Sequence, residues 1–311
     1  MKEIAIAESM GIKLFTTRDH YVSFFNSPYY SHSVTSAIDI YPNSGLYEEQ
    51  ALSPVDGKVV MVREVHPPEP KSFKASTSDW LIFIRSKDGR YLGIRVLHAK
   101  PEVRVGDRID IGDVLGRHIR SGYFNFWTGP HIHVEIRDLE NPLRAKGGYP
   151  LTPINNTALQ KYAPRNVSNN PNLKVDLLDE EYLIVNPDSW IGRIGGFWGF
   201  ACKIGEEIGL LDGGLPHYGR CGVHLNSTER IERGDLVKIG NLTVGTVTEK
   251  AENYALFKCF PIRTSVNTLT LRGLSLYLHL KRPQGFKVVP YAPGYTLSLK
   301  DSREDMIVKL E

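Results

Sequence analysis

Two histidines two residues apart, His131 and His133, stand in the segment GPHIHVEIRD (129 to 138). The segment has the apolar alternation of a β-strand, and side chains at positions i and i+2 of a strand point to the same face. The two imidazoles would therefore project side by side, so that one could bind a metal ion while the other serves as an acid, a base or a hydrogen-bond donor. A strand with two half-buried polar residues would show the same spacing, so the pair alone does not decide between these interpretations.

A carboxylate and a third histidine add to this chemistry. Asp39 lies between Ile38 and Ile40 in SAIDIYP (36 to 42), and His98 ends an alternating apolar run. Burying a carboxylate is costly unless it is paired or bound to a metal. An Asp on the exposed face of an edge strand and a structural His would also fit, so each feature gains weight only from the others.

Taken in order, these segments resemble the lysostaphin-type zinc endopeptidases, also called LytM-like. The matching segments are SAIDIYP (36 to 42), ALSPVDGKVV (51 to 60), His98, VRVGDRIDIGDVLGR (103 to 117) and GPHIHVEIRD (129 to 138). Their order and spacing follow that family over residues 28 to 140, and the rest of the chain lies outside the resemblance.

The resemblance implies a role for each matching residue. Asp39 and His133 would be ligands of one Zn²⁺ per chain, and His98 and His131 would flank the attacking water or the substrate carbonyl. Three N/O ligands leave the fourth zinc position open, as catalysis requires. Zinc would activate water and polarise the carbonyl, and a histidine would move the proton. The implied activity is that of a hydrolase, a metalloendopeptidase cutting a peptide or peptidoglycan-like substrate.

The third ligand is where this chain departs from the family pattern. The family carries a His four residues before the Asp, and here Thr35 stands at that position. Because loops tolerate insertions, we predict that His32, seven residues before Asp39, reaches the metal instead. The alternatives are a lost ligand or the more distant His20. A lost ligand would favour a non-catalytic peptidase-like module that binds or regulates a partner.

Strand signals dominate the chain. WLIFIRS (80 to 86) and YLGIRVLH (91 to 98) predict a hairpin closed at Asp88 and Gly89. Further strands are predicted within 51 to 65, 103 to 117 and 131 to 138, and convincing amphipathic helices are absent from this half of the chain. Short strands with Gly turns indicate an all-β fold, a sandwich-like barrel. The resemblance implies the duplicated hybrid motif type.

The chain is predicted to hold two domains. The first, the peptidase-like domain, covers residues 1 to 145, and a Pro/Asn-rich linker covers 146 to 172. Residues 173 to 311 form a second, smaller, mostly β accessory domain, expected to be a barrel, whose role the sequence does not give. Its strands are predicted at 182 to 186, 236 to 240, 242 to 249, 255 to 262 and 269 to 281.

Two features of the second half are weaker. GDLVKIGNLTVG (234 to 245) echoes GDRIDIGDVLG (106 to 116); the turn chemistry of Gly-Asp explains most of this likeness, and a true structural repeat is the less favoured alternative. A structural zinc on His217, Cys221 and His224, with Cys202 or Cys259, is the less favoured alternative because no Cys-x-x-Cys pair is present. We interpret the three cysteines as free thiols.

The composition limits the classes of partner that the sequence supports. Lys and Arg number 38 against 35 acids, a net charge of +3 that does not argue for nucleic acid. No stretch reaches the ~20 apolar residues that span a bilayer. The first fifteen residues carry charges and lack a leader's apolar core. We therefore expect a cytoplasmic protein without a membrane partner, or an extracellular one if a leader was removed.

Overall fold

The computed structural model describes residues 3–70, 72–89, 91–154, 173–186, 190–281, 285–296, 299 and 306–311. The chain divides into two compact units. The first comprises Met1–Phe24 and Tyr29–Ile154, and the second comprises Phe25–Pro28 and Asn155–Glu311. The predicted linker lies outside the described residues from residue 155 onward.

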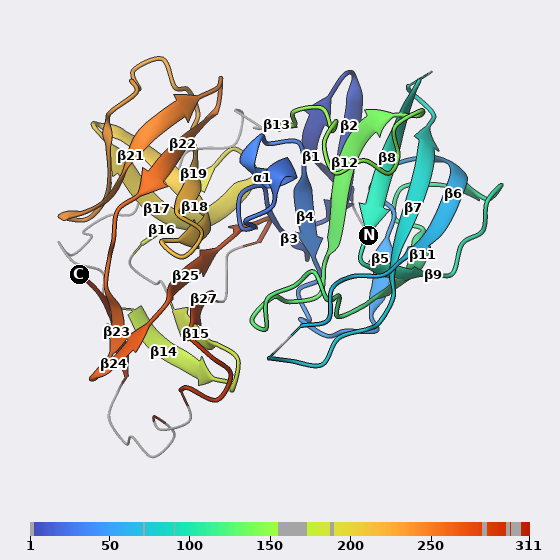
Figure 1. The fold of residues 1–311 in the computed structure, drawn as a ribbon. Coiled ribbons are helices and arrows are strands. Elements are labelled where there is room, and N and C mark those ends of the chain that lie inside the picture. Colours follow the sequence, from blue (N-terminus) through green and yellow to red (C-terminus); the bar gives the residue numbers. More distant parts are fainter. Residues whose placement is uncertain are drawn as a thin grey trace. The chain divides into compact units, whose positions relative to one another are not determined.

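The described residues are almost entirely strand and connecting loop (Figure 1), which confirms the all-β class. Their one α-helix, α1 (Tyr30–Ser33), is a single turn. In the part of the chain that is described, no helix has the length and apolar character needed to cross a membrane.

One antiparallel sheet of the first unit carries the residues of interest. Its strands run in the spatial order β3 (Tyr21–Ser23), β4 (Ile38–Tyr41), β12 (Ile132–Asp138), β8 (Leu92–Leu97), β7 (Asp79–Ser86), β6 (Gly57–Val65) and β10 (Arg108–Ile109). Two three-stranded sheets complete the unit: β13 (Thr152–Pro153), β1 (Glu3–Ser9) and β2 (Ile12–Thr17); and β5 (Gln50–Leu52), β11 (Val114–His118) and β9 (Ala99–Pro101).

Strand β12 shows why the sequence folds in this way. Ile132, Val134 and Ile136 are 2%, 0% and 0% exposed and supply the core side of the strand. The intervening positions, His133 and Glu135 among them, point to the opposite face because side chains alternate along a strand. One face of β12 therefore carries a row of polar side chains that is itself buried.

The predicted hairpin is confirmed. β7 and β8 pair antiparallel, with Leu81 opposite Leu97 and Ile84 opposite Ile94. The strand signal within residues 51 to 65 corresponds to two strands, β5 and β6, which lie on either side of Pro54. There the Asp56 carboxylate accepts a hydrogen bond of 2.6 Å from the backbone N–H of Ile111, which fixes the bend.

The second unit contains a closed barrel, in agreement with the predicted accessory barrel. Its strands pair in the circuit β17 (Phe197–Ile204), β18 (Glu207–Leu215), β19 (Arg220–His224), β22 (Tyr254–Cys259), β21 (Leu242–Lys250) and β20 (Leu236–Ile239), and β20 closes on β17. β16 (Ile191–Ile194) forms a hairpin with β17.

The remaining strands of the second unit extend this sheet. They are β14 (Leu173–Leu178), β15 (Leu183–Asn186), β23 (Thr264–Val266), β24 (Leu269–Leu271), β25 (Gly273–Leu276), β26 (Leu278–His279), β27 (Phe286–Val289) and β28 (Ile307–Leu310). The single strand predicted for 269 to 281 is wrong, because β24, β25 and β26 divide it. Gly273, with φ +148°, marks the first break, where a side chain would collide with the Leu215 carbonyl oxygen.

The two Gly-Asp segments form the same local turn in separate units. The Asp107 carboxylate accepts a 2.7 Å hydrogen bond from the Arg104 N–H, and Asp235 accepts one of 2.8 Å from Glu232. Similar turn chemistry accounts for the echo.

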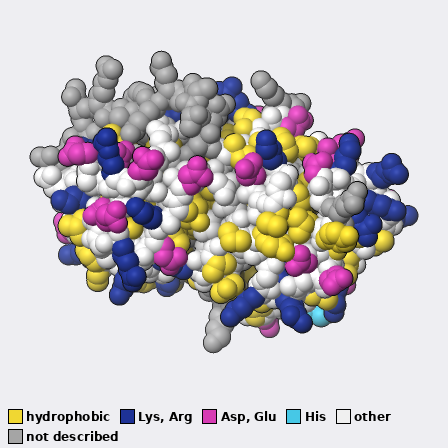
Figure 2. All heavy atoms as spheres, turned by 90° about the horizontal axis from the view of Figure 1, so that it is seen from above, with side chains coloured by type: hydrophobic (Ala, Val, Ile, Leu, Met, Phe, Trp, Pro, Cys, Tyr) yellow, Lys and Arg dark blue, Asp and Glu magenta, His cyan; other side chains and the backbone are white. Residues whose placement is uncertain are grey.

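On the face of the molecule in Figure 2, Lys and Arg side chains are interspersed with Asp and Glu, as near-balanced charge predicts.

Candidate metal centre

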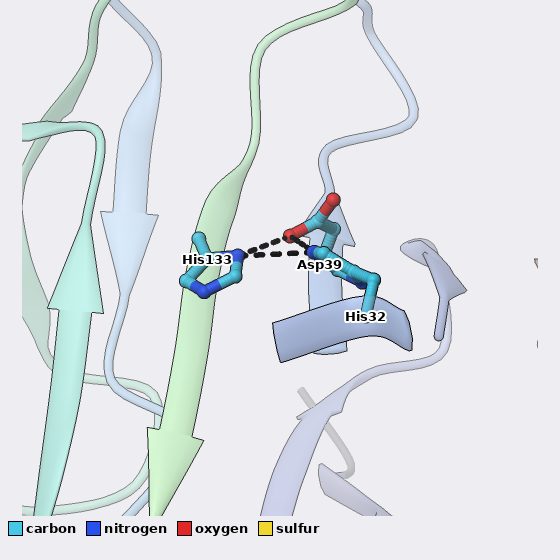
Figure 3. A group of neighbouring side chains, drawn as sticks. All are labelled: His32, Asp39 and His133. Atoms are coloured by element: carbon cyan, nitrogen blue, oxygen red, sulfur yellow. Dashed lines mark hydrogen bonds and ion pairs between the residues drawn. The ribbon is translucent and has the colours of Figure 1, made fainter. Parts of the chain in front are cut away.

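Three side chains of the first unit meet at one point (Figure 3). His32 comes from α1, Asp39 from β4 and His133 from the neighbouring strand β12, where it stands directly opposite Asp39. Asp39 Oδ1 lies 3.2 Å from His32 Nε2 and 2.9 Å from His133 Nδ1, and the two nitrogens are 3.1 Å apart. Among the described residues these form the one group of His, Cys, Asp and Glu side chains with metal-site geometry.

The spacing of these atoms fits a small tetrahedral cation. Zinc binds nitrogen and oxygen ligands at about 2.0–2.1 Å, which places two ligands of a tetrahedron roughly 3.3 Å apart. The three observed separations, 2.9, 3.1 and 3.2 Å, are close to that edge length. Two imidazoles and one carboxylate also form a donor set that zinc accepts. The residues present therefore fit the metal that the sequence predicts.

His32 is held so that one defined nitrogen faces the group. Its Nδ1–H donates to the backbone carbonyl of Phe24 at 2.8 Å, which leaves Nε2 as the free ligand atom. The turn that connects α1 to β4 is closed by a hydrogen bond of 2.7 Å from the Ser36 N–H to the Ser31 carbonyl. Thr35, at the family's ligand position, has φ +57° and is not part of the group.

Asp39 presents one oxygen to the group and anchors the other. The Tyr41 hydroxyl donates to Oδ2 at 3.3 Å, while Oδ1 faces His32 and His133. Burial favours the neutral acid, but the nearby His32 and His131 outweigh it and hold the pKa of Asp39 well below its ordinary value. The carboxylate is therefore ionised and available to a cation.

His133 lies between two carboxylates. Its Nδ1 contacts Asp39, and its Nε2 contacts Glu135 Oε1 at 2.8 Å. Burial disfavours the charged ring, but the hydrogen bonds to Asp39 and Glu135 prevail and raise the pKa of His133 to about 9. In the metal-free protein, a proton on Nδ1 thus occupies the place that a bound cation would take.

His98 lies beside this group and is oriented by a residue that sequence reasoning missed. Asp79 Oδ2 accepts hydrogen bonds of 2.6 Å from His98 Nδ1–H and 2.6 Å from the Ser121 hydroxyl, and Oδ1 accepts one of 3.0 Å from the His98 backbone N–H. An ionised carboxylate can only accept, so Nδ1 carries the proton and Nε2 is left with its lone pair. His98 has φ +71°, a strained backbone conformation typical of functional positions.

His131 precedes β12 on the same side of the group. Its Nδ1–H donates to the Gly129 carbonyl at 3.0 Å, and its Nε2 lies 3.7 Å from Asp39 Oδ2. Burial lowers the pKa of His131 to about 3, so the ring is neutral. Phe124, also missed from the sequence, stacks on His131 with ring centroids 4.5 Å apart and meets His98 edge-on at 4.8 Å.

All five predicted site residues are buried. The exposed fractions are 2% for His32, 3% for Asp39, 7% for His98, 4% for His131 and 7% for His133. The aromatic segment around Phe124 covers the His98 and His131 side of the group. A signal for this cover exists in the sequence as the aromatic run YFNFW (123 to 127).

Other candidate ligands do not join the group. The Nδ1 of His20, the distant substitute, lies 2.7 Å from the Thr16 hydroxyl. In the second unit, the Cys221 thiol donates to the Asp212 carbonyl at 3.0 Å, and His224 Nε2 lies 3.1 Å from Asp212 Oδ2. Within the described residues, the set predicted around Cys221 does not assemble into a metal-binding group.

Comparisons with known proteins match parts of the chain. A family model described as "Domain of unknown function (DUF8155) N-terminal domain" matches residues 12–153. A search of curated proteins finds no match.

Three solved structures show limited similarity to the chain. A mutant catalytic domain of the prophage-encoded M23 protein EnpA from Enterococcus faecalis is 20% identical, with a TM-score of 0.25, over 37% of this chain and 72% of that one. Lysostaphin from Staphylococcus simulans is 13% identical, with a TM-score of 0.26, over 79% and 99%. The NMR structure of lysostaphin is 14% identical, with a TM-score of 0.23, over 72% and 86%.

Proposed function

We propose that this protein is a zinc-dependent endopeptidase that hydrolyses an amide bond of a peptide or peptidoglycan-like substrate. The observation that supports it is the convergence of His32, Asp39 and His133 at tetrahedral-edge distances beside two further histidines. In this proposal, His32 Nε2, Asp39 Oδ1 and His133 Nδ1 hold the zinc. When bound, zinc would supply a Lewis acid that polarises the scissile carbonyl and acidifies a water molecule.

His98 is the residue suited to move the proton. Its Nε2 lone pair can accept a proton from the attacking water, and the Asp79 carboxylate stabilises the imidazolium that results. His98 can then return this proton to the departing amine. Asp79 acts through His98 and is therefore a positioning residue.

His131 has a different part in this proposal. Because Nδ1–H is committed to the Gly129 carbonyl, Nε2 faces the site as an acceptor without a proton. It can receive a hydrogen bond from the attacking water or from the amine, and so orients the reactants. It does not serve as the donor to a developing oxyanion in this tautomer.

A second candidate function is a non-catalytic module that uses the same fold to bind or regulate a partner. The burial of all five side chains favours it, because a substrate needs access to the reacting atoms. The endopeptidase requires a bound zinc and catalysis, whereas the binding module requires neither.

The first test is zinc content, measured by plasma mass spectrometry on wild type, His32→Ala and His133→Ala, with the exposed His66→Ala as the matched control. The expected result is one zinc per chain in wild type and control, and loss in both ligand variants. If the wild-type protein holds no zinc even after metal is added, the proposal is contradicted. Zinc kept by His32→Ala would remove His32 from the ligand set.

The second test is hydrolysis of a quenched fluorogenic peptide library and of purified peptidoglycan. The expected result is cleavage that 1,10-phenanthroline abolishes and added zinc restores. A zinc-loaded protein that cleaves neither would support the binding module instead.

A further inference from the structure

Behind His133 lies a cluster of three charged residues, Arg95, Glu135 and Arg137, here called the buried triad. Their exposed fractions are 6%, 0% and 0%. Glu135 stands two residues after His133 on the same face of β12, and Arg95 stands opposite Glu135 on β8. Arg95 Nη2 donates to Glu135 Oε1, and Arg137 Nη1 donates to Oε2 at 2.6 Å. Both oxygens of Glu135 are thus fixed.

The fixed carboxylate holds one ring of the metal centre. Glu135 Oε1 accepts the Nε2–H of His133 at 2.8 Å, which leaves Nδ1 for the metal. A carboxylate behind a ligand histidine fixes its tautomer and ring orientation and makes it a stronger donor. The salt bridges to both arginines help His133 to lower the pKa of Glu135 to about 2, against the effect of burial.

Keeping such a cluster in the interior is costly for folding. Buried ion pairs seldom stabilise a protein more than well-packed apolar side chains of the same size would. The geometry gives the triad another use, because Glu135 contacts the candidate ligand His133.

The two arginines of the triad also donate hydrogen bonds to the backbone of a surface segment, residues 141–148. Arg137 donates from Nε to the Asn141 carbonyl at 2.9 Å and from Nη2 to the Lys146 carbonyl at 2.7 Å. Arg95 Nη1 donates to the Arg144 carbonyl at 3.0 Å. A Cβ at Gly148 would come within 2.8 Å of Glu135 Oε2, so the segment approaches as bare backbone.

The same segment reaches the other side of the metal centre. The Lys146 ammonium lies 4.7 Å from the ring centroid of Tyr30, on the helix that carries His32. A Cβ at Gly148 would also lie 3.1 Å from the Ser36 side chain, between His32 and Asp39 in sequence. One segment therefore contacts both the His133 support and the His32 loop.

We propose that Glu135 is a positioning residue for the metal ligand His133, and that residues 141–148 clamp the buried triad and so set how tightly the site holds its metal. This inference rests on the proposed zinc site, but not on the reaction performed there.

The experiment measures the zinc dissociation constant by competition with a chelating dye, for wild type, Glu135→Gln and Gly148→Ala. Glu140→Gln is the matched control, because Glu140 is exposed on the same stretch and loses the same charge. We expect a loss of affinity of about 10–100-fold in Glu135→Gln and in Gly148→Ala and no change in the control. Circular dichroism of each metal-free variant checks that it is folded.

A spectroscopic readout separates positioning from general destabilisation. Long-range ¹H–¹⁵N spectra of the zinc-bound protein should show His133 protonated at Nε2 and bound through Nδ1 in wild type. This pattern should weaken in Glu135→Gln. If Glu135→Gln fails to fold, Gly148→Ala carries the test, because it displaces the carboxylate without removing a charge.

The outcomes separate the two proposals. Wild-type zinc affinity in folded Glu135→Gln or Gly148→Ala would overturn the positioning role or the clamp, respectively, while the zinc site would stand. A wild type that binds no zinc would overturn both proposals.

Discussion

The Asp79 carboxylate accepts two hydrogen bonds from His98, one from the backbone N–H at 3.0 Å and one from the ring Nδ1–H at 2.6 Å. The two residues lie at the open end of the β7–β8 hairpin, where Asp79 starts β7 and His98 directly follows β8. This double contact fixes the ring and holds a strained backbone in place. In the proposed reaction, this orientation suits His98 to carry the proton.

Replacing Asp79 by Asn should lower kcat by roughly 10²–10⁴-fold, since the amide can donate to Nδ1 and so impose the wrong tautomer on His98. Zinc content should stay at the wild-type level because Asp79 is not one of the three residues of the candidate metal group. Steady-state kinetics and metal analysis on the same samples check this. An unchanged kcat would show that His98 is not the proton carrier.

Stability should depend on pH through His118, which is 2% exposed. Burial outweighs the backbone hydrogen bond with His131 and lowers the pKa of His118 to about 4. The unfolded chain therefore takes up the proton first as pH falls below the ordinary value of about 6.5, and the free energy of unfolding decreases between about pH 6.5 and 4. The loss is at most ~1.4 kcal/mol per pH unit from this residue.

Urea unfolding of the metal-free protein at about pH 7 and pH 4.5 measures this slope. His118→Gln should lose less stability between the two pH values than wild type, by about 2 kcal/mol, whereas the exposed His66→Gln should behave as wild type. Equal slopes in all three proteins would contradict the assignment.

The cover formed by Phe124 should control the exchange of metal. Its ring packs on both His98 and His131, so Phe124→Leu should expose the site and speed the removal of zinc by EDTA several-fold. Phe126→Leu is the control, since Phe126 is buried to a similar degree but packs on Trp127. Identical stripping rates for both variants and wild type would show that zinc leaves by another route.

The thiols of the second unit should be inert in the folded protein. Cys202, Cys221 and Cys259 are free and buried, and burial raises the pKa of each thiol. Thiolates, rather than thiols, react with alkylating agents. Iodoacetamide should therefore label none of the three in native protein and all three in urea, as intact mass spectrometry can show. Rapid native labelling at any one would contradict this.

The parts of the site that sequence patterns predict are those set by local rules. The alternation HIHVEIRD places His133 on the buried polar face of β12, and the apolar flanks of Asp39 place it on β4. Both follow from the two-residue period of a strand. The sequence predicts His32 because a loop can absorb extra residues, and in the structure these residues form α1.

Which residues support the site depends on the register between neighbouring strands, and local sequence patterns do not give that register. Leu81 pairs with Leu97, so counting along the hairpin brings Asp79 next to His98. The Asp-Gly turn does not give this count, because a two-residue turn at Asp88 and Gly89 would pair Leu81 with Val96, one residue away from the observed register. Arg95 and Glu135 lie on strands 40 residues apart in the chain, and their pairing becomes visible only once β8 and β12 are adjacent.

The grouping of Phe25–Pro28 with the second unit has a practical consequence. The Phe25 ring lies against Gly222, where any side chain would collide with it, and 5.6 Å from the rings of His224 and Tyr254. Its chain neighbour Phe24 supplies the carbonyl that orients His32. A truncated gene ending at Ile154 would thus encode Phe25 without its packing partners. Phe25 is joined by one peptide bond to Phe24, whose carbonyl orients the candidate ligand His32. We therefore expect that expressing the unit with the candidate metal centre by itself requires redesign of residues 25–28.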